Sequence, residues 1–226
     1  MGSQALTESV EDYLKTIFEL VSIHGRASTT QIAEVLDVKP ASVTGMVQRL
    51  AETDPPLLVY EKHRGVLLTP TGEKAALEVI RSHRLIERFL YEILGFSWDK
   101  VHEEAHRLEH VISEEFEERM AAVLGNPTHD PHGDPIPSRD LKMPTCTNLC
   151  LHNLQVGQTA IVKRVPDADS ALLCYLAEVG VIPGTCIEVM DYSPFDENLK
   201  IKVAENDELI VFGPRITTKI YVEIIP

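Results

Sequence analysis

The chain has 226 residues, of which 44 % are hydrophobic and 25 % are charged, so it is long enough for one large domain or two to three small ones. No apolar run approaches the roughly eighteen residues of a membrane helix, and residues 1–13 lack the pattern of a signal peptide, so a cytoplasmic protein is expected. The net charge of −14 argues against a general nucleic-acid binder, because phosphate contacts require cations, without excluding a specific DNA-binding domain.

The first third of the chain combines three helical segments with a hairpin. The expected elements are helices over residues 7–24, 29–38 and 39–53 and strands over residues 57–62 and 65–69. Gly25 ends the first helix, and Pro40 lies in the first turn of the third, where its missing N–H costs little. Three helices followed by a two-stranded hairpin are the parts of a winged helix-turn-helix.

The third helix is expected to bury the stripe of Val43, Met46, Val47 and Leu50. The residues nearer the outside are Ala41, Ser42, Thr44, Gly45, Gln48 and Arg49. Small and hydroxyl side chains at a helix start permit close approach to the major groove of DNA, and cations beside it meet phosphate. The candidate phosphate contacts are Lys39, Arg49 and, from the hairpin, Lys62, His63 and Arg64. The alternative is a module that contacts another protein and not DNA.

The rest of the chain divides into a helical and a β-rich part. Residues 70–95 and 98–124 predict two long amphipathic helices, which we expect to pack on the N-terminal domain and on a second copy of the chain. Residues 125–145 contain five prolines and two glycines and predict a linker or a pinned loop. Short strands are expected over residues 160–165, 185–192, 199–205, 208–213 and 219–225, and one helix over residues 170–180. Five short strands predict a small barrel, so the fold class is α+β.

The second long helix is rich in histidine. Its segment KVHEEAHRLEH, residues 100–110, contains His102, His106, Glu109 and His110. At about 100° per residue, one continuous helix would project all four from a single stripe. Imidazole nitrogen and carboxylate oxygen are usual ligands of divalent transition metals. His83 and Glu87, four residues apart on the preceding helix, provide a second pair of ligands.

Two metal sites are therefore expected, one from His83, Glu87 and His102 and the other from His106, Glu109 and His110. A solvated acidic helix face is one alternative. A second is a metal-dependent hydrolase, because residues 102–106 fit the H-E-x-x-H pattern with Glu103 as the base. That alternative leaves the remaining ligands unexplained. Cys146 and Cys150 have a C-x3-C spacing, which is a weak metal signal without a matching pair.

Taken together, these segments resemble the metal-dependent repressors of the diphtheria toxin repressor type, which have iron-responsive and manganese-responsive branches. The matching stretches are EDYLKTIFEL, TTQIAEVLDVKPASVTGMVQRL, LLTPTGEKAA, HRLIERFLYEILG and DKVHEEAHRLEHVISEEFEERM, and the match covers residues 8 to about 124. The PHGDPIP loop extends it. The resemblance implies a winged helix-turn-helix over residues 1–74, a helical dimerisation and metal-binding domain over 75–145, and an SH3-like, FeoA-type domain over 146–226.

Carried over by position, the resemblance implies a primary, activating metal site of Asp12, His106, Glu109 and His110 and an ancillary site of His83, Glu87 and His102. Asp167 and Asp169 are candidates to complete the ancillary site from the SH3-like domain. Asp12 and His106 stand where the iron-responsive branch has methionine and cysteine, and harder ligands favour Mn(II) over Fe(II). Zn(II), Co(II) or Ni(II) are expected to substitute.

Two further departures from the family pattern bear on stoichiometry and DNA preference. Lys15 stands where the binuclear manganese branch has a glutamate, which disfavours a second adjacent ion. Gly45 replaces a glutamine that contacts DNA in the family.

The resemblance also implies a homodimer that binds double-stranded operator DNA with an inverted repeat and represses genes for manganese or iron uptake. A metal ion that joins Asp12 to the dimerisation helices would fix the spacing of two recognition helices. Metal and DNA would then strengthen each other's binding. No enzymatic activity and no membrane partner are expected.

Overall fold

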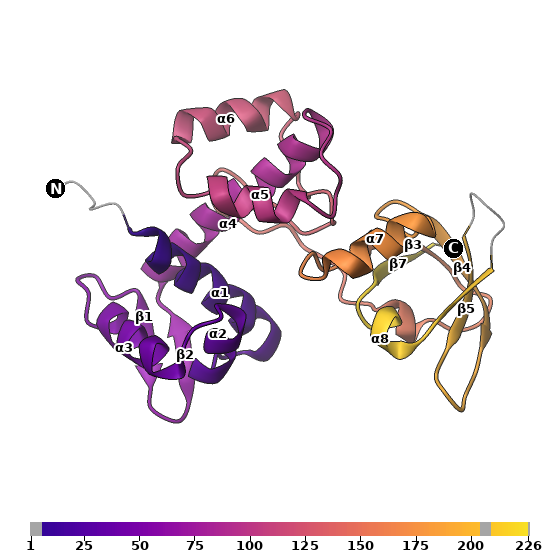
Figure 1. Cartoon of the computed structure of the whole chain (residues 1–226), viewed down its shortest axis with the longest axis horizontal. Helices are drawn as coiled ribbons and strands as arrows, with labels where there is room; N and C mark the ends of the chain where they lie inside the picture. The colour runs from indigo at the N-terminus through magenta and orange to yellow at the C-terminus, as the bar shows by residue number, and fades with distance from the viewer. Residues whose placement is uncertain (1–5, 204–208, 226) are drawn as a thin grey trace. The chain divides into compact units, whose positions relative to one another are not determined.

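The computed structural model describes residues 6–203 and 209–225 (Figure 1). The chain divides into two compact units. The first comprises the described part of Met1–Ser82 together with Glu109–Ile112 and Arg139–Lys142. The second comprises His83–Leu108, Ser113–Ser138 and the described part of Met143–Pro226. Each unit encloses its own cluster of buried apolar side chains. No helix in the described ranges is long and apolar enough to cross a membrane.

The first unit contains the winged-helix elements expected from the sequence. They are α1 (Glu8–His24), α2 (Thr29–Val35), α3 (Pro40–Ala51), β1 (Leu58–Glu61), β2 (Gly65–Leu68) and the start of α4 (Pro70–Glu92). Ser28 caps α2, because its hydroxyl accepts a hydrogen bond from Gln31 N while the Gln31 side chain accepts one from Ser28 N. α2 ends earlier than expected, because Asp37 adopts a left-handed conformation with a φ of 50°.

The wing is held against the helices by its backbone. Ala27 and Val66 exchange two backbone hydrogen bonds, of 3.2 and 2.8 Å. Next to them Gly65 has a φ of 98°, and a Cβ at this position would lie 2.6 Å from Ala27 O, so the close approach requires glycine. The fully buried side chains of the core include Leu14, Ile17, Ile32, Val43, Val47 and Val66. α3 is therefore anchored by its predicted apolar stripe.

The second long helix expected from the sequence is interrupted. α5 (Val101–Leu108) ends before Glu109, residues 109–111 form a turn, and α6 (Glu114–Val123) begins after Ser113. The Ser113 hydroxyl accepts a hydrogen bond from Phe116 N, and three glutamates in the first turn interact favourably with the positive end of the helix dipole. Both features favour the start of a new helix at this point. The prediction of one continuous helix over residues 98–124 is wrong, and so is the single stripe of four ligands.

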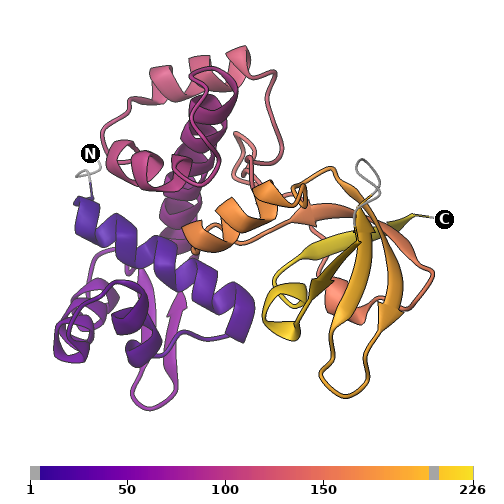
Figure 2. The same cartoon turned by 45° about the vertical axis from the view of Figure 1, so that its right-hand side comes forward.

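The C-terminal part of the second unit is a five-stranded antiparallel sheet that curves around one core (Figure 2). Its elements are η1 (Leu151–Asn153), β3 (Thr159–Arg164), α7 (Ser170–Glu178), β4 (Cys186–Tyr192), β5 (Leu199–Val203), β6 (Leu209–Phe212), α8 (Pro214–Thr217) and β7 (Tyr221–Ile225). The strand order is β6-β5-β4-β3-β7. All five predicted strands and the helix are present, although the expected strand positions 204, 205 and 208 lie outside the described residues. η1 and α8 are too short to leave a periodic pattern.

The proline-rich segment after α6 is a pinned loop and not a free linker over residues 128–136. Asp130 Oδ1 accepts hydrogen bonds from the backbone N–H groups of His132 and Asp134, at 2.8 and 2.9 Å. Within the same unit, Val165 N donates to His132 O at 2.9 Å. A Cβ on Gly133 would lie 1.9 Å from Lys163 O, so glycine permits the loop to lie directly against β3.

Candidate metal centres and DNA-binding surface

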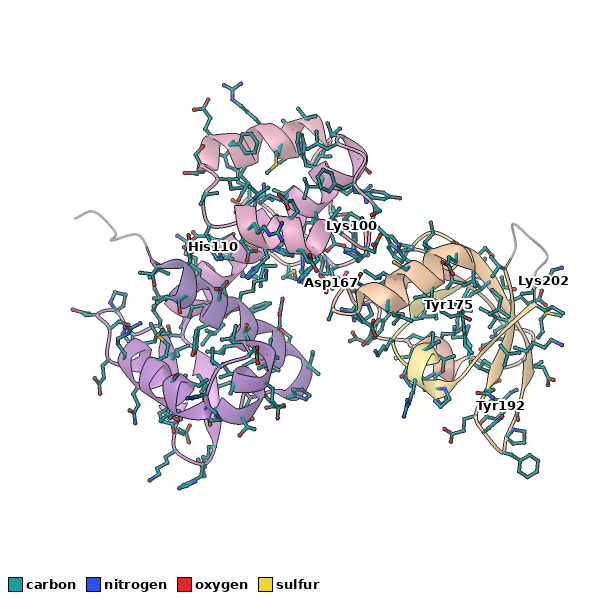
Figure 3. The ribbon with its side chains drawn as sticks, in the orientation of Figure 1. Lys100, His110, Asp167, Tyr175, Tyr192 and Lys202 are labelled. Carbon is teal, nitrogen blue, oxygen red and sulfur yellow. The ribbon has the colours of Figure 1, made fainter. Side chains whose placement is uncertain are left out.

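The first cluster of metal-type ligands lies within the first unit. Asp12 comes from α1, and Glu109 and His110 come from the turn after α5; His110 is labelled in Figure 3. Their ligand atoms lie within 4.8 Å of one another. His110 Nε2 is 3.0 Å from Asp12 Oδ1 and 3.4 Å from a carboxylate oxygen of Glu109. One imidazole nitrogen and two carboxylates form a donor set that suits a divalent first-row metal ion.

Two cationic groups compensate the carboxylates of this cluster. Lys15 Nζ donates to both oxygens of Glu109, at 2.8 and 3.2 Å, and the Glu109 side chain is fully buried. Burial acts to lower the pKa of His110, but a hydrogen bond to Glu11 and the charges of Glu109, Asp12 and Glu11 raise it. A positive charge is thus favoured where the ligand atoms converge.

Glu11 is a member of this cluster that the sequence did not indicate. Its carboxylate lies 2.6 Å from His110 Nδ1, on the side of the ring opposite the nitrogen that faces Asp12. A carboxylate that holds one imidazole nitrogen and directs the other toward a metal is a common outer-shell arrangement. The only signal was an acidic residue next to Asp12, and neighbouring residues on a helix normally point about 100° apart.

His106, the fourth residue expected at this site, lies in the second unit. It is exposed on α5, within two residues of the end of that helix. Glu109 and His110 follow the end of α5 at Leu108 and belong to the first unit. His106 therefore stays a predicted ligand of this site.

The second cluster lies wholly within the second unit. His83 and Glu87 come from one face of α4, His102 comes from α5, and Asp167, labelled in Figure 3, lies between β3 and α7. The atoms His83 Nε2, Glu87 Oε1 and His102 Nδ1 are separated pairwise by 3.0 to 3.2 Å. Asp167 Oδ2 lies 2.8 Å from His102 Nδ1. Two ligands at right angles on an ion about 2.1 Å away are about 3 Å apart, so these spacings match those of neighbouring ligands on one ion.

The charges of this cluster favour a cation. Burial acts to raise the pKa of Glu87, but the neighbouring histidines hold it well below its usual range. Burial acts to lower the pKa of His102, yet hydrogen bonds to Asp167 and Glu87 and their charges raise it to about 10. His83 and Glu87 are buried, whereas His102 and Asp167 are half-buried, so the cluster is open to water on the side of the last two.

The second candidate from the SH3-like domain, Asp169, has a different position. Its Oδ1 accepts a hydrogen bond from Leu172 N and caps α7. Its Oδ2 lies 3.8 Å from Lys219 Nζ. Among the described residues, the groups of converging ligand atoms include Asp167 but not Asp169. The choice of Asp169 as a ligand is therefore not supported by its position.

The predicted DNA-reading residues lie on α3 and the wing of the first unit. The exposed ones are Lys39, Ala41, Ser42, Gly45, Gln48, Arg49, Lys62, His63 and Arg64, and Thr44 is half-buried. The Thr44 hydroxyl donates to Pro40 O and Arg49 contacts the Met46 sulfur, so both side chains are held along the helix. Arg64 and Arg26 both bind Glu61, and the hydrogen bonds from these two residues lower the pKa of Glu61.

Neither the cysteines nor Glu103 takes part in a cluster of converging ligands within the described ranges. Cys146 and Cys150 are unbridged and are exposed and half-buried, respectively. Glu103 is exposed on α5, whereas His102 points into the second cluster.

Comparison with known proteins identifies the family. The chain matches the sequence model of the iron-dependent repressor N-terminal DNA-binding domain over residues 5–66 and that of the metal-binding and dimerisation domain over residues 69–138. Residues 149–224 match the FeoA domain.

Individual relatives agree with these models. The iron-dependent repressor IdeR of Mycobacterium leprae is 36 % identical over 197 residues, which are 81 % of this chain and 84 % of the relative. IdeR of Mycobacterium tuberculosis is 42 % identical over 132 residues, but that alignment spans only 56 % of the relative and 58 % of this chain. A solved manganese-dependent transcriptional repressor in complex with manganese aligns with a TM-score of 0.87 and 34 % identity, covering 96 % of this chain and all of that one.

The matching relatives and solved structures are named as repressors, which argues against the hydrolase alternative. The fold is α+β, with a winged helix-turn-helix, a helical metal-binding and dimerisation domain and an SH3-like FeoA domain. The chain therefore belongs to the family of iron- and manganese-dependent transcriptional repressors.

Proposed function

We propose that this protein is a metal-activated homodimeric repressor that binds an inverted-repeat operator and controls genes for manganese or iron uptake. The observation that carries the proposal is the meeting of α1 with the turn after α5, where His110 Nε2 lies 3.0 Å from Asp12 Oδ1. α1 belongs to the DNA-binding domain, whereas the turn at residues 109–111 lies in the metal-binding and dimerisation domain. A metal ion held by both would connect metal concentration to the placement of α3.

The residues proposed for the primary site are Asp12, His106, Glu109 and His110, and those for the ancillary site are His83, Glu87, His102 and Asp167. The metal would supply a fixed positive charge that carboxylates and imidazoles from different segments bind together. Glu11 would orient His110, while Lys15 would give up part of its contact with Glu109. Because DNA binding and metal binding would share this arrangement, each must strengthen the other by the same factor.

Mn(II) is the favoured activating ion. Carboxylate oxygen and imidazole nitrogen, without a thiolate or thioether, suit a harder ion. Fe(II) is the second candidate, and Zn(II), Co(II) or Ni(II) should bind the same donors. The names of the relatives include both iron and manganese, so they support a divalent transition metal without choosing between the two.

The dimer is proposed to form through the helical domain. Ile93, Leu94 and Phe96, which follow α4, are exposed apolar residues. The proposed functional segments are residues 1–74 for DNA binding, 75–145 for dimerisation and metal binding and 146–226 for the SH3-like domain. A repressor of this kind would act in the cytoplasm, on chromosomal DNA.

The test uses chelator-stripped protein and a pool of random DNA duplexes near physiological salt. Retention of duplexes is compared with and without Mn(II), for the wild type, for Asp12→Ala and for Glu73→Ala, which removes an exposed carboxylate from the same unit. We expect selective, Mn(II)-dependent retention by the wild type and by Glu73→Ala but not by Asp12→Ala, and the retained duplexes should share an inverted repeat. Equal retention with and without metal would contradict the proposal.

A further inference from the structure

A third group of ligand-type atoms lies directly beside the ancillary cluster, within the second unit. Glu87, Asp130 and His132 are 0 %, 2 % and 0 % exposed, and their ligand atoms lie within 4.8 Å of one another. Each of the three has a buried polar atom without a hydrogen-bond partner, namely Glu87 Oε2, Asp130 Oδ2 and His132 Nδ1. Buried polar atoms are nearly always satisfied, so three unsatisfied ones at the same place indicate a missing ligand.

The hydrogen bonds of His132 define which of its nitrogens is available. His132 Nε2 lies 2.7 Å from Trp98 O, and a carbonyl oxygen can only accept, so Nε2 carries the proton. In the neutral ring Nδ1 then presents a lone pair. A histidine that donates one N–H to a backbone carbonyl and presents the other nitrogen is oriented in the manner of a metal ligand.

The unpartnered atoms are spaced for an ion and not for direct hydrogen bonding. His132 Nδ1 and Glu87 Oε2 are 4.0 Å apart, which is too long for a hydrogen bond. Two ligands of one ion, each about 2.1 Å from it, are separated by about 3 to 4.2 Å. All three facing atoms are acceptors when the carboxylates are ionised and the imidazole is neutral.

Two arginines lie near the pocket, and both contact Asp134, Arg164 at a distance of 3.1 Å. Arg84 Nε lies 4.0 Å from Asp130 Oδ2, but Arg84 also lies 3.8 Å from Asp134 and donates to Pro135 O. Burial raises the pKa of Asp130 well above its usual range, and the nearby Glu87 and Asp134 carboxylates raise it further. A divalent cation would satisfy the three atoms and remove the repulsion between Glu87 and Asp130.

Glu87 belongs to both groups, and each group uses a different oxygen. Its Oε1 contacts His83 and His102, whereas its Oε2 faces His132. We propose that Glu87 bridges two divalent cations, one bound by His83, His102 and Asp167 and the other by Asp130 and His132. Two ions that share a carboxylate are typically about 3.5–4 Å apart. This inference rests on the proposed ancillary site and extends it to a binuclear centre, so that each chain binds three ions in all.

The test counts and examines Mn(II) in the full-length protein. Equilibrium dialysis with atomic absorption should give three ions per chain for the wild type and two for Asp130→Asn and His132→Gln. Asn keeps the oxygen that accepts from the backbone N–H groups of the loop, and Gln can still donate to Trp98 O, so both variants should fold. The matched control is His129→Gln, in the same loop, which should keep all three ions.

Electron paramagnetic resonance distinguishes a bridged pair from isolated ions. The wild type and His129→Gln should show a spin-coupled Mn(II) signal at low temperature, and His132→Gln should lose it while retaining uncoupled Mn(II). Two ions per chain without a coupled signal in the wild type would overturn the inference and indicate that water fills the pocket. Asp12→Ala should lose one ion but keep the coupled signal. If the pair forms but Mn(II) does not promote DNA binding, the proposed repressor function fails and the binuclear centre stands.

Discussion

The two candidate metal clusters are built in different ways. The second cluster takes two of its ligands from adjacent turns of one helix, α4, and its histidine and glutamate atoms already have the spacing of ligands on one ion. The first cluster joins Asp12 to residues almost a hundred positions later, and Lys15 and His110 provide its positive charge. In the first cluster a metal must displace the Lys15 contact with Glu109, whereas in the second it must replace protons on histidines that already converge. The comparison indicates a switch in the first unit and a structural centre in the second.

The largest expected effect is a loss of folding stability when the second cluster is disrupted. Glu87→Ala removes a fully buried carboxylate that compensates two histidines, and breaking such a buried pair typically costs about 3–5 kcal/mol. Urea unfolding of the metal-free protein should show this loss. The matched control, Glu92→Ala, removes an exposed partner of Arg88 and should change the unfolding midpoint little. Equal midpoints for the wild type and Glu87→Ala would refute the structural role.

The next effect concerns the orientation of His110. Glu11→Gln weakens the contact at His110 Nδ1, and loss of such an outer-shell carboxylate typically costs about 10- to 100-fold in metal affinity. Competition with a fluorescent chelator should show weaker Mn(II) binding at one site, and Glu8→Gln, on the exposed start of the same helix, should bind like the wild type. An unchanged affinity in Glu11→Gln would show that Glu11 does not position the ring.

Lys15→Met should strengthen Mn(II) binding, in contrast to Glu11→Gln, which should weaken it. It removes the cation that occupies both Glu109 oxygens, so the metal-free state loses a buried pair while the metal-bound state loses less. We expect roughly tenfold tighter Mn(II) binding together with a lower unfolding midpoint of the metal-free protein. Lys74→Met, which removes an exposed lysine of α4 in the same unit, serves as the control. Weaker metal binding in Lys15→Met would mean that the lysine supports the site and does not compete with the ion.

The smallest expected effect is a weaker affinity for DNA in Lys62→Ala, with metal binding unchanged. Lys62 is exposed on the wing, and loss of one phosphate contact should weaken binding to all duplex sequences and reduce the salt dependence by about one unit of slope. Anisotropy titrations at several salt concentrations measure both quantities. Mn(II) binding by Lys62→Ala in the absence of DNA should match the wild type. A change in sequence preference without a change in slope would place Lys62 at a base and not at phosphate.

The sequence predicted helices and strands with a periodic apolar pattern, and it predicted ligands that lie one helical turn apart. Val43, Val47 and Leu50 predicted the buried face of α3, and the His83–Glu87 pair predicted one side of the second cluster. The break after Leu108 was not predicted, because the apolar pattern continues through it and only Ser113 indicates a new helix. The sequence did not indicate the roles proposed for Glu11, Asp130 and His132. Those roles rest on tertiary contacts with His110, with the loop at residues 128–136 and with Glu87, which no local spacing encodes.

The most direct test of the switch is the affinity of Mn(II) for the protein with and without a selected operator duplex. The account predicts that the duplex tightens Mn(II) binding by the same factor by which Mn(II) tightens duplex binding. Asp12→Ala should abolish this factor, and His83→Ala should preserve it as long as the protein stays folded. If the duplex leaves the Mn(II) affinity of the wild type unchanged, the first cluster does not couple metal to DNA, and the account is wrong.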